Sequence, residues 1–163
     1  MFGLGTGVAR FRGFLQHREM LLKEGKKVGP ATLFVGFRHE ANDFFLNQNY
    51  EEWMKHGVLS DVHPAFSHDN IEERGFYFIP DLMADQPEDV LRALKPKCGE
   101  SKESHSVDMF YCGPALGIPE MIEKAMAAAV SKAAPVAGMD ENDIKTILDN
   151  IAQQEDRFHA ECF

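Results

Sequence analysis

A glycine-rich loop at the start of the chain is the first feature whose residues could do chemistry. Gly3, Gly5 and Gly7 alternate with Leu4 and Thr6, and a segment with helical apolar spacing follows directly. Glycines let a backbone approach a ligand closely, and the N–H groups that begin the next helix can face an anion. Thr6 adds a hydroxyl donor, so the loop has the outline of a pyrophosphate cradle. The same string also fits a tight turn before a helix.

Two common phosphate-binding motifs do not match this loop. The dinucleotide motif G-x-G-x-x-G would place its third glycine at Val8, and a P-loop would need a Gly-Lys-Ser or Gly-Lys-Thr ending that the loop lacks. The missing lysine disfavours a P-loop nucleotidase. The loop alone leaves the pyrophosphate site and the tight turn both open.

The elements that must position this loop are helices and strands in alternation, as judged from apolar spacing. The predicted helices cover 8–25, 47–55, a segment from Pro87, a segment around 122–130 and a last one with Asp140 as its N-cap. The predicted strands cover 32–37, 62–67 and 107–112. This order predicts an α/β fold, a parallel sheet with helices on both faces, in which ligands bind beyond the carboxyl ends of the strands.

Composition excludes several classes of protein. The chain has 163 residues, enough for one domain, and its 17 Lys+Arg against 26 Asp+Glu give a net charge of -9. This acidic balance predicts no binding to nucleic acid or to an anionic membrane. No apolar stretch has the length of a membrane span or of a signal-peptide core, and the polar segment 95–106 is predicted as an exposed loop insertion.

The cysteines and histidines do not form a metal-binding pattern. Cys98, Cys112 and Cys162 are irregularly spaced, and the histidines have no paired spacing. We therefore expect no metal site. Three cysteines at such spacing are typical of free thiols in a reducing compartment, so a cytoplasmic location is predicted.

A longer string around the glycine loop is more specific. Residues 3–18 read GLGTGVARFRGFLQHR, which resembles the NADP-binding segment G-P-G-T-G-V-A-P-F-x-G-F-x-Q-x-R of the diflavin reductases, such as cytochrome P-450 reductase, the sulfite reductase flavoprotein and the nitric oxide synthase reductase domain. Further strings resemble family segments in the same order. They are TLFVGFR at 32–38, DFFL at 43–46, AFSHD at 65–69, YCG at 111–113 and RFHAECF at 157–163.

The resemblance implies a ferredoxin-reductase-type, Rossmann-like nucleotide-binding domain over residues 1–163. Such a domain holds NADPH so that its nicotinamide can pass a hydride to FAD, and FMN then delivers electrons to a heme protein or another acceptor. The FAD and FMN domains lie upstream in the family, so the chain is expected to be a C-terminal piece that is inactive alone. The first strand is expected to be largely missing, with only Met1 and Phe2 left. The fragment itself is expected to make no membrane contact, although a longer protein could be anchored to the cytosolic face of a membrane.

The resemblance also assigns cofactor-binding residues. Thr6 and the backbone of Gly5 and Gly7 match the pyrophosphate contacts, Arg38 matches a phosphate-binding arginine, and Ser67 matches the serine at the adenosine 2′-phosphate. Without the resemblance, Arg38 would be interpreted as a surface arginine.

The 2′-phosphate segment departs from the family pattern. His68 stands where the family has arginine, and Arg74 is one residue out of register with the family lysine. Tyr77, or Phe76 in its place, matches the tyrosine that stacks on the adenine. NADPH is the predicted cofactor. NADH remains an alternative, because histidine is mostly neutral near pH 7.

The nicotinamide end of the site is assigned to four residues. Cys112 matches the cysteine beside the nicotinamide, with Gly113 following it in the same cofactor-binding motif. Glu161 matches the family aspartate of that cluster, and Phe163 matches the terminal aromatic ring that stacks over the flavin. Without the resemblance, Cys112 would be interpreted as a buried strand cysteine, and Glu161 and Phe163 as part of a frayed tail.

Two alternative functions remain open. Leu4 and Arg10 stand where the family has prolines, and together with His68 they are compatible with a non-catalytic nucleotide-binding or interaction module derived from such a reductase. The other alternative is the reductase part of a sulfite- or pyruvate-linked enzyme.

Overall fold

The structure is a computed structural model, and it describes residues 1–44, 47–94, 107–152 and 158–162. The predicted loop at 95–106 lies outside the described residues, as do the predicted site residue Phe163 and Arg157 of the matching tail string.

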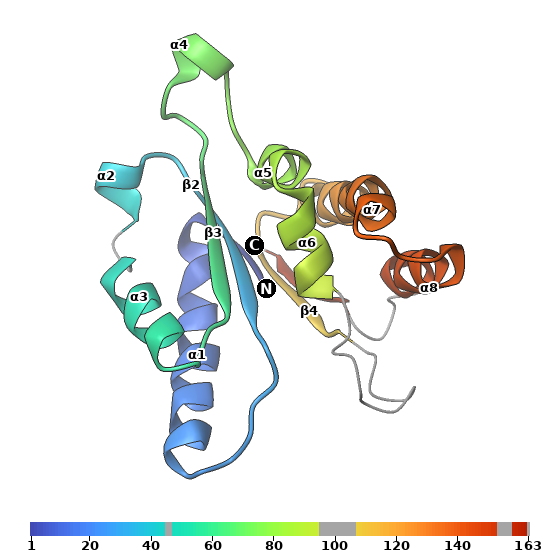
Figure 1. Cartoon of the computed structure of the whole chain (residues 1–163). Coiled ribbons are helices and arrows are strands. Elements are labelled where there is room, and N and C mark those ends of the chain that lie inside the picture. The colour runs from blue at the N-terminus through green and yellow to red at the C-terminus, as the bar shows by residue number, and fades with distance from the viewer. Residues whose placement is uncertain (45–46, 95–106, 153–157, 163) are drawn as a thin grey trace. The chain divides into compact units, whose positions relative to one another are not determined.

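The described strands form one sheet in the order β3-β2-β1-β4-β5 (Figure 1). The strands are β1 (Phe2–Leu4), β2 (Thr32–Phe37), β3 (Asp61–Phe66), β4 (Met109–Gly113) and β5 (Phe158–Cys162). The β1–β2, β1–β4 and β2–β3 pairs are parallel, with Phe2 opposite both Phe34 and Tyr111. The predicted parallel α/β fold of Rossmann-like type is confirmed.

Helices occupy most of the segments between these strands. They are α1 (Val8–Lys23), α2 (Glu40–Asp43), α3 (Asn47–Lys55), α4 (Ile71–Arg74), α5 (Ile79–Asp85), α6 (Pro87–Leu94), α7 (Ile118–Val136) and α8 (Glu141–Ala152), with a 3-10 turn, η1 (Gly5–Gly7), before α1. Each predicted helix is present. The short helices α2, α4 and α5 were not predicted because four to seven residues carry too little apolar periodicity to recognise.

The chain divides into two compact units. The first unit holds residues 1–79, 111–114 and 161–163, and the second holds residues 80–110 and 115–160.

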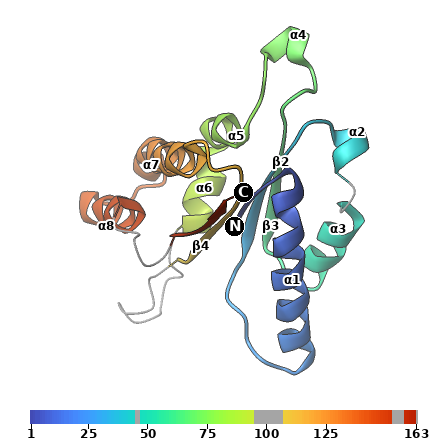
Figure 2. The same cartoon turned by 180° about the vertical axis from the view of Figure 1, so that it is seen from behind.

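In the first unit, α1 lies along the strands (Figure 2). Val8, Phe11 and Leu15 are buried on its sheet side, as the apolar stripe predicted. Gly3 of β1 faces this stripe, since a Cβ there would lie 2.9 Å from Val8 Cγ2. The helix also contacts the segment after α3, where Arg18 Nε donates to Val58 O at 2.9 Å.

In the second unit, α7 packs against α6 and against α8. The buried side chains recur at helical spacing, for example Val90 and Leu94 in α6 and Ile122 and Met126 in α7. Asp140 caps α8 as predicted, because its Oδ1 accepts the Asp143 N–H at 2.8 Å.

The first strand is short, but it occupies the middle of the sheet. β1 has three residues, which pair with β2 on one side and β4 on the other, and Phe34 N donates to Met1 O at 2.9 Å. Phe2 is buried and stacks on Phe34 with ring centroids 5.3 Å apart. The strand is therefore longer than the two residues that the sequence predicted. Pairing on both sides and the aromatic contact stabilise it.

Pro64 also finds a place that the sheet tolerates. It lies in β3, which ends the strand order, and it is opposite Val35 of β2. A proline cannot donate to a ladder, so an edge strand is where it costs least.

Candidate functional site

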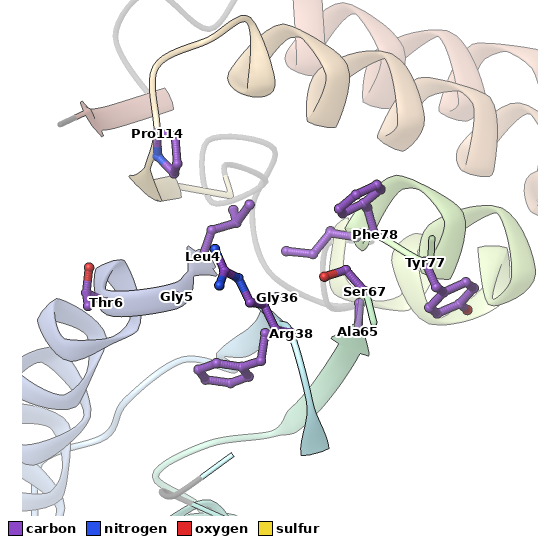
Figure 3. Close-up of a pocket in the computed structure, with 12 residues that line it drawn as sticks. Leu4, Gly5, Thr6, Gly36, Arg38, Ala65, Ser67, Tyr77, Phe78 and Pro114 are labelled. Atoms are coloured by element: carbon purple, nitrogen blue, oxygen red, sulfur yellow. The ribbon is translucent and has the colours of Figure 1, made fainter. Parts of the chain in front are cut away.

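A pocket of about 300 Å³ lies at the carboxyl ends of β1, β2 and β3, within the first unit (Figure 3). Its lining residues are Leu4, Gly5, Thr6, Gly36, Phe37, Arg38, Ala65, Ser67, Tyr77, Phe78, Ile79 and Pro114. The pocket lies at the strand ends, where a parallel sheet is expected to place its ligand site. The pocket brings together Gly5, Thr6, Arg38, Ser67 and Tyr77 of the predicted cofactor residues.

The three glycines of the opening loop are required for three different reasons. Gly5 has a φ of +53°, and a Cβ there would meet nothing within 4 Å, so its open side is free for a ligand. Gly7 is buried, and a Cβ there would lie 2.1 Å from the carbonyl oxygen of Cys112. Gly3 packs against α1. Gly5 is therefore the glycine suited to ligand approach, and Gly7 is the glycine that lets α1 begin against β4.

Polar groups from two strands face the pocket opposite the loop. Arg38 follows β2 and is exposed, and Figure 3 shows its side chain extending from the end of β2 toward Leu4. Ser67 follows β3 and is buried, with 7% of its surface exposed. A guanidinium and a hydroxyl on one wall are groups that bind phosphate oxygens.

The backbones that carry these groups are tied together beyond the strand ends. Ser67 N donates to Phe37 O at 2.8 Å, and His68 N donates to Arg38 O at 2.8 Å. These bonds extend the β2–β3 ladder into the loops and hold Arg38 and Ser67 side by side.

Asp69 reinforces this connection from outside the pocket. Its Oδ1 is 2.9 Å from His39 Nδ1, and its Oδ2 accepts the Glu40 N–H at 2.9 Å. The backbone donor at Glu40 and the His39 side chain lower the pKa of the Asp69 carboxyl below its usual range, Arg74 adding a smaller effect. Asp69 ends the string at 65–69 that resembles a family segment, but only the structure shows its hydrogen-bond partners.

His68 lies behind Ser67. Its Nδ1 is 2.8 Å from Ser67 Oγ, and its ring contacts His39 and Phe76 at centroid distances of 5.6 and 5.3 Å. His68 does not line the pocket itself. It therefore touches the site through the serine hydroxyl.

The aromatic residues that follow α4 divide between the pocket and the surface. Tyr77 and Phe78 line the pocket, whereas Phe76 is 57% exposed and does not. Of the two rings predicted for the adenine, Tyr77 is thus the one at the pocket. The Arg74 guanidinium lies 4.0 Å above the centre of the Tyr77 ring, so Arg74 stacks on that ring and is not among the lining residues.

Of the predicted nicotinamide residues that the structure describes, Cys112 and Gly113 lie on β4 and Glu161 lies on β5. Cys112 is buried, and its carbonyl oxygen contacts Gly7. Gly113 is also buried, and a Cβ there would lie 2.6 Å from the Tyr111 hydroxyl, so a larger residue would displace that hydroxyl. Neither Cys112 nor Gly113 lines the pocket.

Tyr111 fixes the turn that follows these two residues. Its hydroxyl donates to Pro114 O at 2.6 Å, and Pro114 lines the pocket. Burial, with smaller effects of Cys162 and Cys112, raises the pKa of Tyr111 to about 12, so the hydroxyl keeps the proton that it donates. The sequence analysis did not assign Tyr111 a role.

Glu161 is paired with Arg10, which stands where the family pattern has proline. Its carboxylate forms an ion pair with Arg10 in the first turn of α1, and both side chains are more than half exposed. This contact joins the C-terminal strand β5 to the helix that follows the glycine loop. Arg10 stands at a position where the family has proline, so the departure and the tail contact are linked.

The apolar part of the lining was missed by the sequence analysis. These residues come from the ends of β2 and β3 and from the start of α5 with the residue before it. They are Gly36, Phe37, Ala65, Phe78 and Ile79.

Neither a metal cluster nor a membrane span is found in the described ranges. No group of three or more His, Cys, Asp or Glu residues gathers there as a metal site requires. No described helix is both long and apolar enough to cross a bilayer.

The chain is similar in sequence to parts of several longer enzymes. The chain is 30% identical to rat (Rattus norvegicus) methionine synthase reductase over 161 residues, 95% of the chain and 21% of that protein. It is 43% identical to the bifunctional cytochrome P-450/NADPH–P-450 reductase 1 of Bacillus subtilis over 129 residues, 79% of the chain and 11% of that protein. It is 27% identical to the NADP(+) pyruvate dehydrogenase of Cryptosporidium parvum over 175 aligned positions, 98% of the chain and 8% of that protein.

These matches cover nearly the whole chain but only a part of each relative, about a fifth of the rat protein and less of the other two. No protein-family model matches the chain. The resemblance inferred from the motifs and the sequence matches agree, and the parallel Rossmann-like sheet is the expected fold. The chain is therefore similar to the NADP-binding domain of the diflavin reductases.

Proposed function

We propose that this chain is the NAD(P)H-binding domain of a flavin-dependent reductase of the diflavin type. NADPH supplies hydride chemistry when bound, and FAD and FMN in the longer protein would carry the electrons to a heme protein or another acceptor. The share of this chain is to bind and orient the nucleotide. A cytoplasmic location is part of the proposal.

The observation that carries the proposal is the composition of the pocket. The open side of Gly5, the Arg38 guanidinium and the Ser67 hydroxyl line the same space at the strand ends, with Tyr77 and Phe78 beside them. Backbone and guanidinium donors suit phosphate oxygens, and an aromatic ring suits adenine stacking. A pocket of about 300 Å³ has room for an adenosine-sized part of a dinucleotide.

We further propose roles for the remaining residues. Gly7 and Thr6 would complete the pyrophosphate contacts, and Gly113 would let the cofactor approach β4. Cys112, Glu161 and Phe163 would lie toward the nicotinamide and the flavin, as the resemblance implies.

Nucleotide binding by the full chain tests this function. We expect NADP⁺ to bind in a calorimetric titration, and Arg38→Ala to weaken binding roughly tenfold or more, the effect of losing a charged hydrogen bond. Arg12→Ala is the matched control, because Arg12 is an exposed arginine on α1 away from the pocket lining. Absence of binding to both NADP⁺ and NAD⁺ at millimolar concentration would overturn the proposal.

A specific contact favours a second candidate, a nucleotide-binding module without a catalytic role. The carboxylate of Glu161, which the resemblance places beside the nicotinamide, is engaged by Arg10. This candidate predicts that NADP⁺ binds while Glu161→Gln in the complete reductase leaves hydride transfer to FAD unchanged. A large loss of hydride transfer in that variant would instead support the catalytic assignment.

A further inference from the structure

The Ser67–His68 pair gives one wall of the pocket a hydroxyl group that is backed by an imidazole. Ser67 lines the pocket and is buried, and its Oγ lies 2.8 Å from His68 Nδ1. The two backbones are held against the β2 end by the bonds to Phe37 O and Arg38 O. The serine hydroxyl is thus positioned between the pocket on one side and an imidazole on the other.

The proton on Nδ1, which the imidazolium always carries and only one of the two neutral tautomers carries, determines what the serine offers to a ligand. When Nδ1 lacks a proton it accepts the Ser67 O–H, and the hydroxyl then presents only lone pairs to the pocket. When His68 is an imidazolium, Nδ1–H donates to Oγ and the serine proton is free to point into the pocket. The first state suits a sugar hydroxyl that donates a hydrogen bond. The second suits a phosphate oxygen that accepts one, and it adds a positive charge.

The other groups around His68 are compatible with this charge. From the β2 loop, Arg38 offers its carbonyl to the His68 N–H, and the His39 ring lies at 5.6 Å with its Nδ1 on the Asp69 carboxylate. Asp69 therefore places a negative charge behind the two rings.

From the segment that follows β3, the contact with His68 is the apolar ring of Phe76. The charged residues of α4 are Glu72, Glu73 and Arg74, all exposed. Arg74 acts on Asp69 and stacks on Tyr77. The charged groups on this side of the pocket are therefore the carboxylates of Asp69, Glu72 and Glu73 and the cations of Arg38 and Arg74.

We propose that His68, acting through Ser67, makes the recognition of a phosphate monoester on the adenosine ribose proton-linked, so that the preference for NADP(H) over NAD(H) is strong at acidic pH and narrows as pH rises. This rests on the proposed function, and it makes His68 a positioning residue for nucleotide specificity. A phosphate monoester has a second pKa near 6, and a neutral imidazole must gain a proton before it can pair with the dianion as a cation. Forming the charged pair then takes up a proton from solvent.

Calorimetric titration of the full chain with NADP⁺ and with NAD⁺ tests the proposal. The ratio of the Kd for NAD⁺ to the Kd for NADP⁺ should fall roughly tenfold between about pH 6 and about pH 8. Repeating the titration near pH 7.5 in buffers of different ionisation heat should show more proton uptake with NADP⁺, up to about one additional proton.

Three variants separate this role from a structural one. His68→Gln keeps a hydrogen-bonding partner for Ser67 but carries no charge. Its ratio of the Kd for NAD⁺ to the Kd for NADP⁺ should stay low and should not fall as the pH rises, because only the phosphate then changes charge, towards the dianion. His68→Arg carries a permanent charge. In this variant the ratio of the Kd for NAD⁺ to the Kd for NADP⁺ should stay high up to about pH 8. His17→Gln is the matched control on the exposed face of α1 and should behave as the unmodified chain.

The outcomes distinguish the inference from the function it rests on. If both nucleotides bind and their ratio does not change with pH, or changes equally in His68→Gln, the inference is wrong and the proposed function stands. If neither nucleotide binds at any pH, the proposed function fails and the inference fails with it.

Discussion

The two walls of the pocket are built in different ways. The glycine wall, residues 4–7, offers a ligand mainly backbone, and its shape depends on the absence of side chains at Gly5 and Gly7. The loop wall consists of residues 38–40 and 67–69. It offers the ligand the side chains of Arg38 and Ser67, and hydrogen bonds between the two loops hold these residues in place. Substitutions in the glycine wall should therefore reduce stability or nucleotide binding strongly. Substitutions in the loop wall should reduce them only in part.

The largest effect is expected from Gly7→Ala. The new Cβ would lie 2.1 Å from the Cys112 carbonyl oxygen, which is backbone and cannot rotate away. We expect the free energy of unfolding to fall by about 3 kcal/mol or more, measured by urea denaturation. Gly13→Ala is the control, because it adds a methyl group in open space on α1 and should instead raise stability by about 0.5–1 kcal/mol. A Gly7→Ala protein as stable as the unmodified chain would remove the distinction between the two walls.

Gly5→Ala should damage binding more than stability. The residue adopts a φ of +53° with open space beside it, so alanine would cost about 1 kcal/mol of strain but no collision within the protein. Its methyl group would occupy the side where a phosphate approaches, and we expect NADP⁺ affinity to fall roughly tenfold or more. If both glycine variants lost stability equally and bound NADP⁺ equally well, the two glycines would share one structural role.

Asp69→Asn should loosen the loop wall without unfolding the sheet. Hydrogen bonds from Glu40 N–H and His39 lower the pKa of Asp69, so its carboxylate stabilises the folded state at neutral pH, and this contribution is lost as the pH falls below about 4. The urea midpoint of the variant should therefore be lower than that of the unmodified chain at pH 7, and the two should converge in acid. A difference that persists unchanged below about pH 3 would contradict this origin.

The smallest effect is expected at the ion pair between α1 and β5. Arg10 and Glu161 are 62% and 56% exposed, and such pairs contribute about 0.5 kcal/mol or less. Arg10→Gln should shift the urea midpoint slightly at low salt and not at all at high salt. A loss well above 1 kcal/mol would mean that the tail is held to α1 by more than this surface pair.

Local patterns predicted most of the architecture. The buried strand at 32–37 coincides with β2, the helix at 47–55 coincides with α3, and Asp140 caps α8 as expected. These succeeded because each depends on apolar spacing or on a cap within a few residues. The strand at 158–162 was not predicted, because five residues near an end acquire strand geometry only by joining a sheet.

The sequence by itself determined the order of elements, the position of the glycine loop before a helix, and the resemblance that assigns Thr6, Arg38 and Ser67 to one ligand, because these are properties of neighbouring residues along the chain. Only the tertiary structure decided that Gly7 faces Cys112, that Asp69 joins two loops and that Arg10 pairs with Glu161. Each of these contacts joins residues far apart in the chain, and their partners are chosen by the parallel register of the strands, which no local pattern encodes.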